Sequence, residues 1–264
     1  MRIVSPTLGL LALAGAAAAA LPVTPVRAPF DYALFARRQL VLRERAQVRA
    51  GQIGANERIV MQRGARVFDS VAAISVRLAD GARARRFFCY FLDPAARGAC
   101  RDFDRPLVVE TAFPPVAAGP GSRAVRVPPG GVLPALAAGS YDALALGDRA
   151  GALLDGGTYV VRTLRLGRRA QLVCTAPCTI QVRDRVRLGD RASMRGQSGG
   201  SVDGLRVESG SARAAVRTGA RVSVIGNVYA PNGRMLLGPD GDYRGRFVAN
   251  DIIVGPRTLV DSES

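Results

Sequence analysis

Apolar and polar residues alternate over about four to six positions along most of this chain, and the alternating segments end at Gly, Asp or Asn. A period of two is typical of β-strands that bury one face, and the residues that follow favour turns. Helical patterns are few, and we expect one short helix over residues 31–45, where it would cap the first coil. The pattern predicts an all-β protein.

One phrase of the sequence recurs at intervals near 20 residues. Its looser copies surround Gly64, Gly81 and Gly219, and a second phrase, Gly-x-x-x-Ala-Asn with an optional Pro, ends at Asn56, Asn232 and Asn250. Such periods are typical of repeat architectures in which each unit is one coil. The sharpest copies of the first phrase are Leu144-Ala-Leu-Gly147-Asp-Arg-Ala150, Leu164-Arg-Leu-Gly167-Arg-Arg-Ala170 and Val186-Arg-Leu-Gly189-Asp-Arg-Ala192.

A strand with one apolar face cannot bury that face alone, but stacked coils share an apolar column and pair their backbones. We therefore predict a single-chain β-solenoid (β-helix), expected to be right-handed. Gly147, Gly167, Gly189 and the three asparagines would form its turns, where Gly, Asn and Asp supply left-handed backbone angles at low steric cost. Asn232 and Asn250 are expected to be neighbours in one ladder. An ordinary β-sandwich is the alternative, although a sandwich has no reason to repeat a phrase.

The repeats suggest how the chain is divided. Residues 1–20 are expected to be a signal peptide, 21–39 an N-terminal linker or cap, and 40–264 the β-solenoid domain. An insertion at about 86–135 interrupts the solenoid, because it is rich in Pro and Gly and holds the first cysteine pair. The segment from Ser198 to Gly204 is predicted to be a flexible loop.

The N-terminal segment has the features of an export signal. Arg2 precedes an apolar stretch that ends in small residues, and Ala18-Ala19-Ala20 offers a cleavage site. A second possible cut follows Ala28, but Pro29 would then begin the mature chain. A retained membrane anchor is the alternative. After removal of the signal no membrane span is expected, and the protein is predicted to be secreted, periplasmic or on the cell surface.

Composition excludes much enzyme chemistry. The chain has no His and no Lys, so its 37 basic residues are all Arg and its formal net charge is +16. Ser-His-Asp and Cys-His catalytic sites and imidazole zinc sites need His, and Schiff-base catalysis needs Lys, so all of these are excluded. Such an arginine-rich chain is attracted to polyanions. A solvated Arg surface without a specific partner explains the charge equally well. A specific nucleic-acid site typically shows a dense run of Arg with interleaved aromatic residues. The sequence has no such run, so no specific nucleic-acid partner is predicted.

Four cysteines form two local pairs. In an exported protein the natural prediction is two disulfides, Cys89–Cys100 and Cys174–Cys178. A metal or redox site at Cys174-x₃-Cys178 is the alternative, but no second group of ligands lies nearby in sequence.

The segment GNVYAPNGRMLLGPDGDYRGRFVANDIIVG resembles the C-terminal coils of bacterial surface β-solenoids of the G-x-I-Y-A-P-N type. Residues 132–167 resemble the P-G-x-Y coils of the same proteins, and the Gly-Ala-x-Val turns are similar to bactofilin-type polymer repeats. The resemblance covers roughly residues 40–84 and 130–260. It implies a β-solenoid in an extracellular, pilus-associated or polymeric setting. The Arg content and the disulfide-bearing insertion depart from it.

These features predict a structural or adhesive protein of the bacterial envelope or extracellular space. Its expected partners are acidic polysaccharide or lipopolysaccharide, bound through Arg, and other envelope or pilus proteins. We assign no catalytic residue, cofactor or metal ligand. Asp184, Arg187 and Asp190 are close in sequence, but the two carboxylates would lie at opposite corners of a coil. Asp240 and Asp242 are predicted to be turn residues, with weak Ca²⁺ binding as the alternative. The alternative function is a carbohydrate-active enzyme, a polysaccharide lyase or hydrolase of the pectin-lyase-like fold, which needs converging carboxylates or an Arg base beside Ca²⁺.

Overall fold

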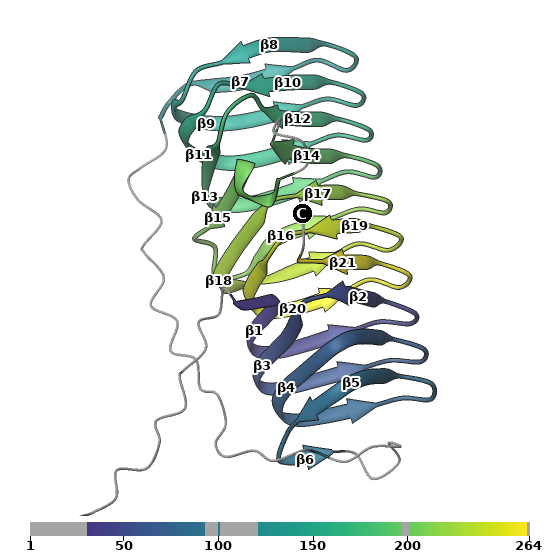
Figure 1. Ribbon diagram of the computed structural model, residues 1–264. Helices are drawn as coiled ribbons and strands as arrows, with labels where there is room; N and C mark the ends of the chain where they lie inside the picture. Colours follow the sequence, from purple (N-terminus) through teal and green to yellow (C-terminus); the bar gives the residue numbers. More distant parts are fainter. Residues whose placement is uncertain (1–30, 93–99, 101–120, 197–200, 263–264) are drawn as a thin grey trace, which may run out of the picture.

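The computed structural model describes residues 31–92, 100, 121–196 and 201–262. Their 21 strands belong to one hydrogen-bonded system in which strands of successive coils pair in parallel. The chain winds into a β-solenoid of about 10 turns (Figure 1). The predicted fold class is confirmed.

A complete coil has three strand segments. In the coil of β11 (Gly157–Leu166) and β12 (Gln171–Cys174), residues 157–161 lie in the first sheet, 163–166 in the second, and β12 in the third. Alternate side chains point inward, so that Tyr159, Val161, Leu164, Leu166 and Leu172 are buried. The pattern of period two therefore fills a single apolar column. We call the corner between the second and third sheets, residues 167–170 in this coil, the turn edge.

The coils are numbered here by their place in the stack. Coil 1 holds β7 (Ala124–Val127) and β8 (Val132–Leu136), coil 2 β9 (Gly139–Leu146) and β10 (Gly151–Leu154), and coil 3 β11 and β12. Coil 4 holds β13 (Cys178–Leu188) and β14 (Ser193–Gly196), and coil 5 a 3₁₀ turn (Val202–Gly204), β15 (Leu205–Ser209), β16 (Ala214–Thr218) and β17 (Ser223–Ile225). Coil 6 holds β18 (Asn227–Leu237) and β19 (Asp242–Arg244), coil 7 β20 (Phe247–Val254) and β21 (Leu259–Asp261), and coil 8 β1 (Tyr32–Leu42) and β2 (Gln47–Ala50). Coil 9 holds β3 (Gln52–Met61) and the start of β4 (Arg66–Leu78), coil 10 the rest of β4 and the start of β5 (Arg83–Phe88), and the end of β5 and β6 (Phe91–Leu92) follow.

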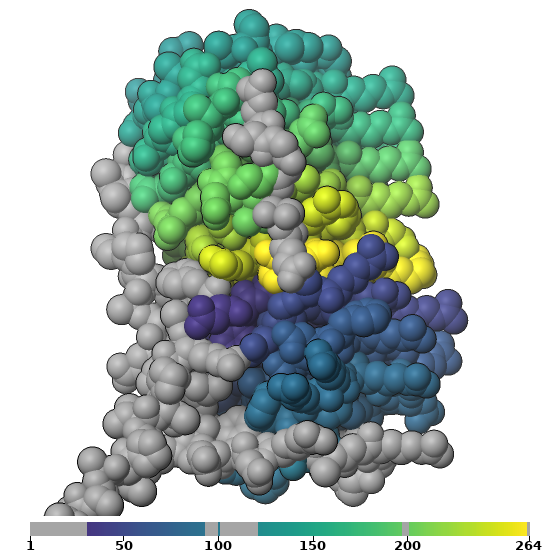
Figure 2. Space-filling view, viewed as in Figure 1, coloured from purple at the N-terminus to yellow at the C-terminus, as the bar shows by residue number. Residues whose placement is uncertain are grey.

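The stacking order differs from the chain order at one place, which we call the seam. The N-terminal block, residues 31–92, stacks on coil 7, the last coil along the chain (Figures 1 and 2). Leu40 pairs with Ile252 on one side and with Ile59 on the other, in the same register. Both predicted blocks of repeats thus belong to one stack, and the apolar column runs through the seam without interruption.

The predicted helix at the N-terminus is wrong. Residues 32–42 form β1, so the solenoid includes Tyr32 onward and part of the expected linker or cap at 21–39. The segment YALFARRQLVL pairs in register with both β20 and β3, and these pairings outweigh its local helical pattern. Residues 1–30, with the expected signal peptide, lie outside the described part of the chain.

The expected insertion at about 86–135 is narrower than predicted. The end of β5, together with β6, β7 and β8, lies within it and belongs to the stack. Residues 93–99 and 101–120 are outside the described segments, as are residues 197–200 of the expected flexible loop. Val202–Gly204 of that loop is a 3₁₀ turn.

Candidate functional site

Ten stacked turns form the turn edge of the described coils, and the third residue of every turn has a positive φ. These φ angles lie between 55° and 71°. The N–H of the third residue donates to the carbonyl of the second residue in the next coil, as in Arg149 N to Arg168 O (2.7 Å) and Arg169 N to Asp190 O (2.9 Å). A continuous hydrogen-bond ladder fixes the edge. The third residues are, in stacking order, Gly130, Arg149, Arg169, Arg191, Arg221, Asp240, Arg257, Arg45, Gly64 and Gly81.

Arginine is an unexpected residue at this position. A left-handed conformation costs an L-residue about 1–2 kcal/mol, which Gly avoids. Gly64, Gly81 and Gly130 show that the same turn forms with glycine. The turn geometry therefore does not require the six arginines, whose side chains are all exposed. Their recurrence at a strained position favours a role for the charge.

Four of these arginines lie in consecutive coils, and we call them the arginine column: Arg149, Arg169, Arg191 and Arg221. Adjacent coils are about 4.8 Å apart, so the column presents one guanidinium group at each such step. Within the described segments, none of the four forms an ion pair. The nearest acids in the turns, Asp148 and Asp190, instead accept backbone N–H groups of Arg168 (2.8 Å) and Ala220 (2.9 Å) in the next coil.

The column has a defined boundary at each end. Coil 1 has Gly130 at the equivalent position. Coil 6 has Asp240, whose carboxylate accepts two hydrogen bonds from Arg257 of coil 7, at 2.6 and 2.9 Å. This pairing lowers the pKa of Asp240 and raises that of Arg257, because each stabilises the charged form of the other. The positive charge of Arg257 is thereby balanced by the carboxylate of Asp240. Arg221 is therefore the last arginine of the column.

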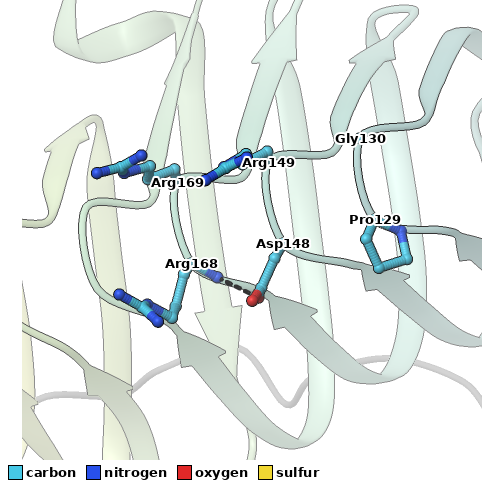
Figure 3. Close-up of a pocket in the computed structure, with 6 residues that line it drawn as sticks. All are labelled: Pro129, Gly130, Asp148, Arg149, Arg168 and Arg169. Carbon is cyan, nitrogen blue, oxygen red and sulfur yellow. Dashed lines mark hydrogen bonds between the residues drawn. The ribbon is translucent and has the colours of Figure 1, made fainter.

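A shallow depression of about 370 Å³ lies at the start of the column, lined by Pro129, Gly130, Asp148, Arg149, Arg168 and Arg169. Figure 3 shows Arg149 and Arg169 projecting on the same side of the turns, away from Asp148 and Arg168. The guanidinium groups of the column are therefore separated from the turn carboxylate. The arrangement can bind anions by charge-assisted hydrogen bonds.

Gly147, Gly167 and Gly189 of the sharpest copies occupy the first position of these turns, but they do not supply the left-handed angle. A Cβ on Gly167 would lie 2.6 Å from the carbonyl carbon of Gly147, and one on Gly189 would lie 2.7 Å from that of Gly167. Glycine is needed there for close approach of the coils. The left-handed angle falls two residues later, on Arg149, Arg169 and Arg191. Each repeated phrase contains this Arg two residues after its glycine, but the sequence alone does not show that the Arg has a left-handed backbone angle.

The carboxylates singled out from sequence do not converge. Asp184 lies 3.7 Å from Arg162 at the corner between the first and second sheets, whereas Asp190 lies at the turn edge. Arg162 also holds Asp142 at 2.6 Å, and this hydrogen bond lowers the pKa of Asp142. Asp242 pairs with Arg244 at 3.3 Å. Among the described residues, no three metal-ligating side chains gather at one place.

The remaining residues predicted from the sequence are the four cysteines and the three asparagines. The cysteines are paired as predicted, with Cα–Cα distances of 5.3 Å for Cys89–Cys100 and 6.1 Å for Cys174–Cys178. Asn232 and Asn250 lie at the same corner of coils 6 and 7, where Ala230 pairs with Ala249. Asn56 lies at this corner two coils beyond Asn250, because coil 8 is inserted between them at the seam.

No protein-family model matches the chain, and neither the curated proteins nor the solved structures include a match. Across the described segments, no helix has the length and apolarity of a membrane span.

Proposed function

We propose that this protein is an exported structural or adhesive β-solenoid of the bacterial envelope or extracellular space, and that it attaches to polyanionic surfaces through the arginine column. The observation that carries the proposal is the run of Arg149, Arg169, Arg191 and Arg221 at left-handed positions where glycine would be less strained. Two disulfides and the expected signal peptide are compatible with an oxidising compartment.

The regular stack supports a scaffold role. Parallel pairing runs from coil 1 to β6, and the buried column is almost entirely aliphatic, so the charged side chains are held on a stiff frame. A rigid row of cations releases counterions from a polyanion while losing little conformational entropy of the backbone.

The test is salt-dependent retention on immobilised heparin and on lipopolysaccharide. A variant with all four column arginines changed to Gln should elute at clearly lower salt than the unchanged protein, because about four ionic contacts are lost. The matched control changes Arg45, Arg58, Arg66 and Arg83 to Gln, which removes the same charge from exposed positions outside the column. Equal elution of the two variants would show that net charge alone is responsible, and salt-independent retention would contradict the proposal.

One observation favours the enzyme alternative: Asp142 and Asp184 flank Arg162 at the corner between the first and second sheets. Hydrogen bonding to Arg162 favours the ionised form of Asp142, which is unsuited to donate a proton as a general acid. Turnover of acidic polysaccharides by the purified protein, lost on Asp142→Asn and Asp184→Asn substitution, would establish the enzyme in place of the scaffold.

A further inference from the structure

We propose that the ligand of the arginine column is a linear acidic polysaccharide that lies along the stack axis over coils 2 to 5. This inference rests on the proposed attachment to polyanions and specifies the class of polyanion and its orientation. It follows from three rows of side chains that run side by side at the turn edge and on the outer face of the third sheet.

The first row is the arginine column, whose charges repeat at about 4.8 Å. One sugar ring of an extended polysaccharide advances by a length similar to this spacing. A chain with one carboxylate on each ring can therefore present its charges in step with the coils. A phosphate polymer has a shorter repeat, so its charges fall out of step with the column after a few units.

The second row lies two residues after each arginine of coils 3 to 5 and consists of Gln171, Ser193 and Ser223. They are Cα partners in adjacent strands, and their buried neighbours Leu172, Met194 and Val224 show that this row faces outward. Amides and hydroxyls both donate and accept hydrogen bonds, which suits sugar hydroxyls. Phosphate oxygens at neutral pH are mainly acceptors and would use only half of this capacity.

The third row lies two residues further on and is largely aliphatic. Leu153, Val173 and Ile225 face outward in register, with Arg195 between the last two. Leu153 is 37% exposed. The C–H faces of sugar rings can pack on such side chains. The three rows contain no aromatic residue, whereas binding of single-stranded nucleic acid relies on aromatic stacking.

The boundaries of the column set the length of the ligand. Gly130 ends the column in coil 1, and coil 6 places the carboxylate of Asp240 at the turn edge and that of Asp242 in the second row, as the partner of Ser223. Four arginines span three coil steps, about 14 Å. The site therefore fits about four sugar rings, and a longer chain gains nothing from coil 6.

The experiment measures affinity of the full-length mature protein for oligomers of a polyuronate with two to eight rings, by calorimetry at fixed salt. Affinity should rise up to about four or five rings and then level off. Arg191→Gly should weaken binding of the longest oligomer about tenfold, as expected for loss of one charge-assisted hydrogen-bonded pair. Arg45→Gly is the matched control, because it removes the same charge from a left-handed turn outside the column, and it should change affinity less than about twofold.

Two further variants test the assignment of the rows. Ser193→Ala with Ser223→Ala should weaken polyuronate binding severalfold and leave binding of inorganic polyphosphate unchanged. Asp240→Arg removes the break and frees Arg257, so the plateau should move to longer oligomers.

Equal losses for Arg191→Gly and Arg45→Gly would overturn this inference, as would tighter binding of polyphosphate or single-stranded DNA of equal charge. Retention of the unchanged protein on heparin separates the two proposals. If the four-Gln column variant is still retained less than its control but polyphosphate or single-stranded DNA binds more tightly than the polyuronate, only the ligand assignment fails. If the unchanged protein is not retained, attachment to polyanions fails as well.

Discussion

Arg38 and Asp251, which are 213 residues apart in sequence, form an ion pair between coils 8 and 7, with Nε–Oδ1 at 3.2 Å and Nη2–Oδ2 at 3.4 Å. The pair itself contributes little, because the Arg38 side chain is more than half exposed. Its importance is that it crosses the seam. There Leu34 pairs with Phe247, Leu42 pairs with Val254, and Gln47 N donates to Thr258 O at 2.8 Å.

A disulfide can be placed across the seam. Val41 and Ile253 are outward-facing Cα partners in adjacent coils, about 4.8 Å apart, which lies within the range for a disulfide. The double variant Val41→Cys with Ile253→Cys should oxidise to one additional bond, seen by mass mapping of a non-reduced digest, and should raise the melting temperature. Leu236→Cys with Val41→Cys is the control, because these positions are two coils apart and should stay unbridged. Bridging in the control alone would contradict the stacking order.

The sequence predicted the coils better than their order. Strand alternation and the Ala-Asn phrase correspond to a real ladder, in which Ala230, Ala249, Ala36, Ala55 and Ala73 are successive partners. Ala36 belongs to the segment expected to be a helix; Arg37 and Arg38 follow it, and no Asn marks the corner. The seam was not predictable, since any coil of this kind offers the same parallel backbone edge to any other. The arginine column was hidden because left-handed angles are expected at Gly and Asn.

Replacing a column arginine by glycine should stabilise the fold. Arg169→Gly removes the steric strain of an L-residue in the left-handed conformation, which favours folding by about 1–2 kcal/mol. Glycine also gives the unfolded chain more conformational freedom, which offsets about 0.4–1 kcal/mol of this gain. We expect a net gain of roughly 0.5–1 kcal/mol in the free energy of unfolding in urea. Arg165→Gly, at an exposed extended position of β11 four residues earlier, should instead lose about 0.5–1 kcal/mol. Destabilisation by both changes would mean that Arg169 makes a compensating contact.

Alkaline pH should destabilise the protein through a buried phenol. Tyr243 is fully buried, and its hydroxyl contacts Thr218 Oγ1 and accepts from Gly238 N at 3.1 Å. Burial raises the pKa of Tyr243 from 10.0 to about 12. The folded protein therefore holds a proton that the unfolded chain has lost between these values. Its contribution is complete below pH 10 and is lost as the pH rises through about 12.

The size of this effect follows from the shift, which corresponds to roughly 2–3 kcal/mol. Urea unfolding between pH 8 and pH 12 should show the decline, and Tyr243→Phe should make it shallower. The variant should also be less stable by about 1 kcal/mol at pH 8, because hydrogen bonds to Thr218 and Gly238 are lost. An identical decline in both proteins would assign the pH dependence to other groups, such as Tyr159, whose pKa burial also raises to about 12.

Coil 1 should resist end-to-end association because of a proline. Among the described strands, β8 pairs with β10 alone, and its register shifts after Leu133, at Pro134. Proline has no N–H to offer a further strand, and an irregular strand is a poor template for pairing. Pro134→Val should therefore increase self-association with concentration in sedimentation velocity. Pro129→Val, at the turn of the same coil, removes a proline without adding a strand donor and should leave the protein unchanged. Monomeric behaviour of Pro134→Val at every concentration would show that something other than Pro134 blocks this end of the stack.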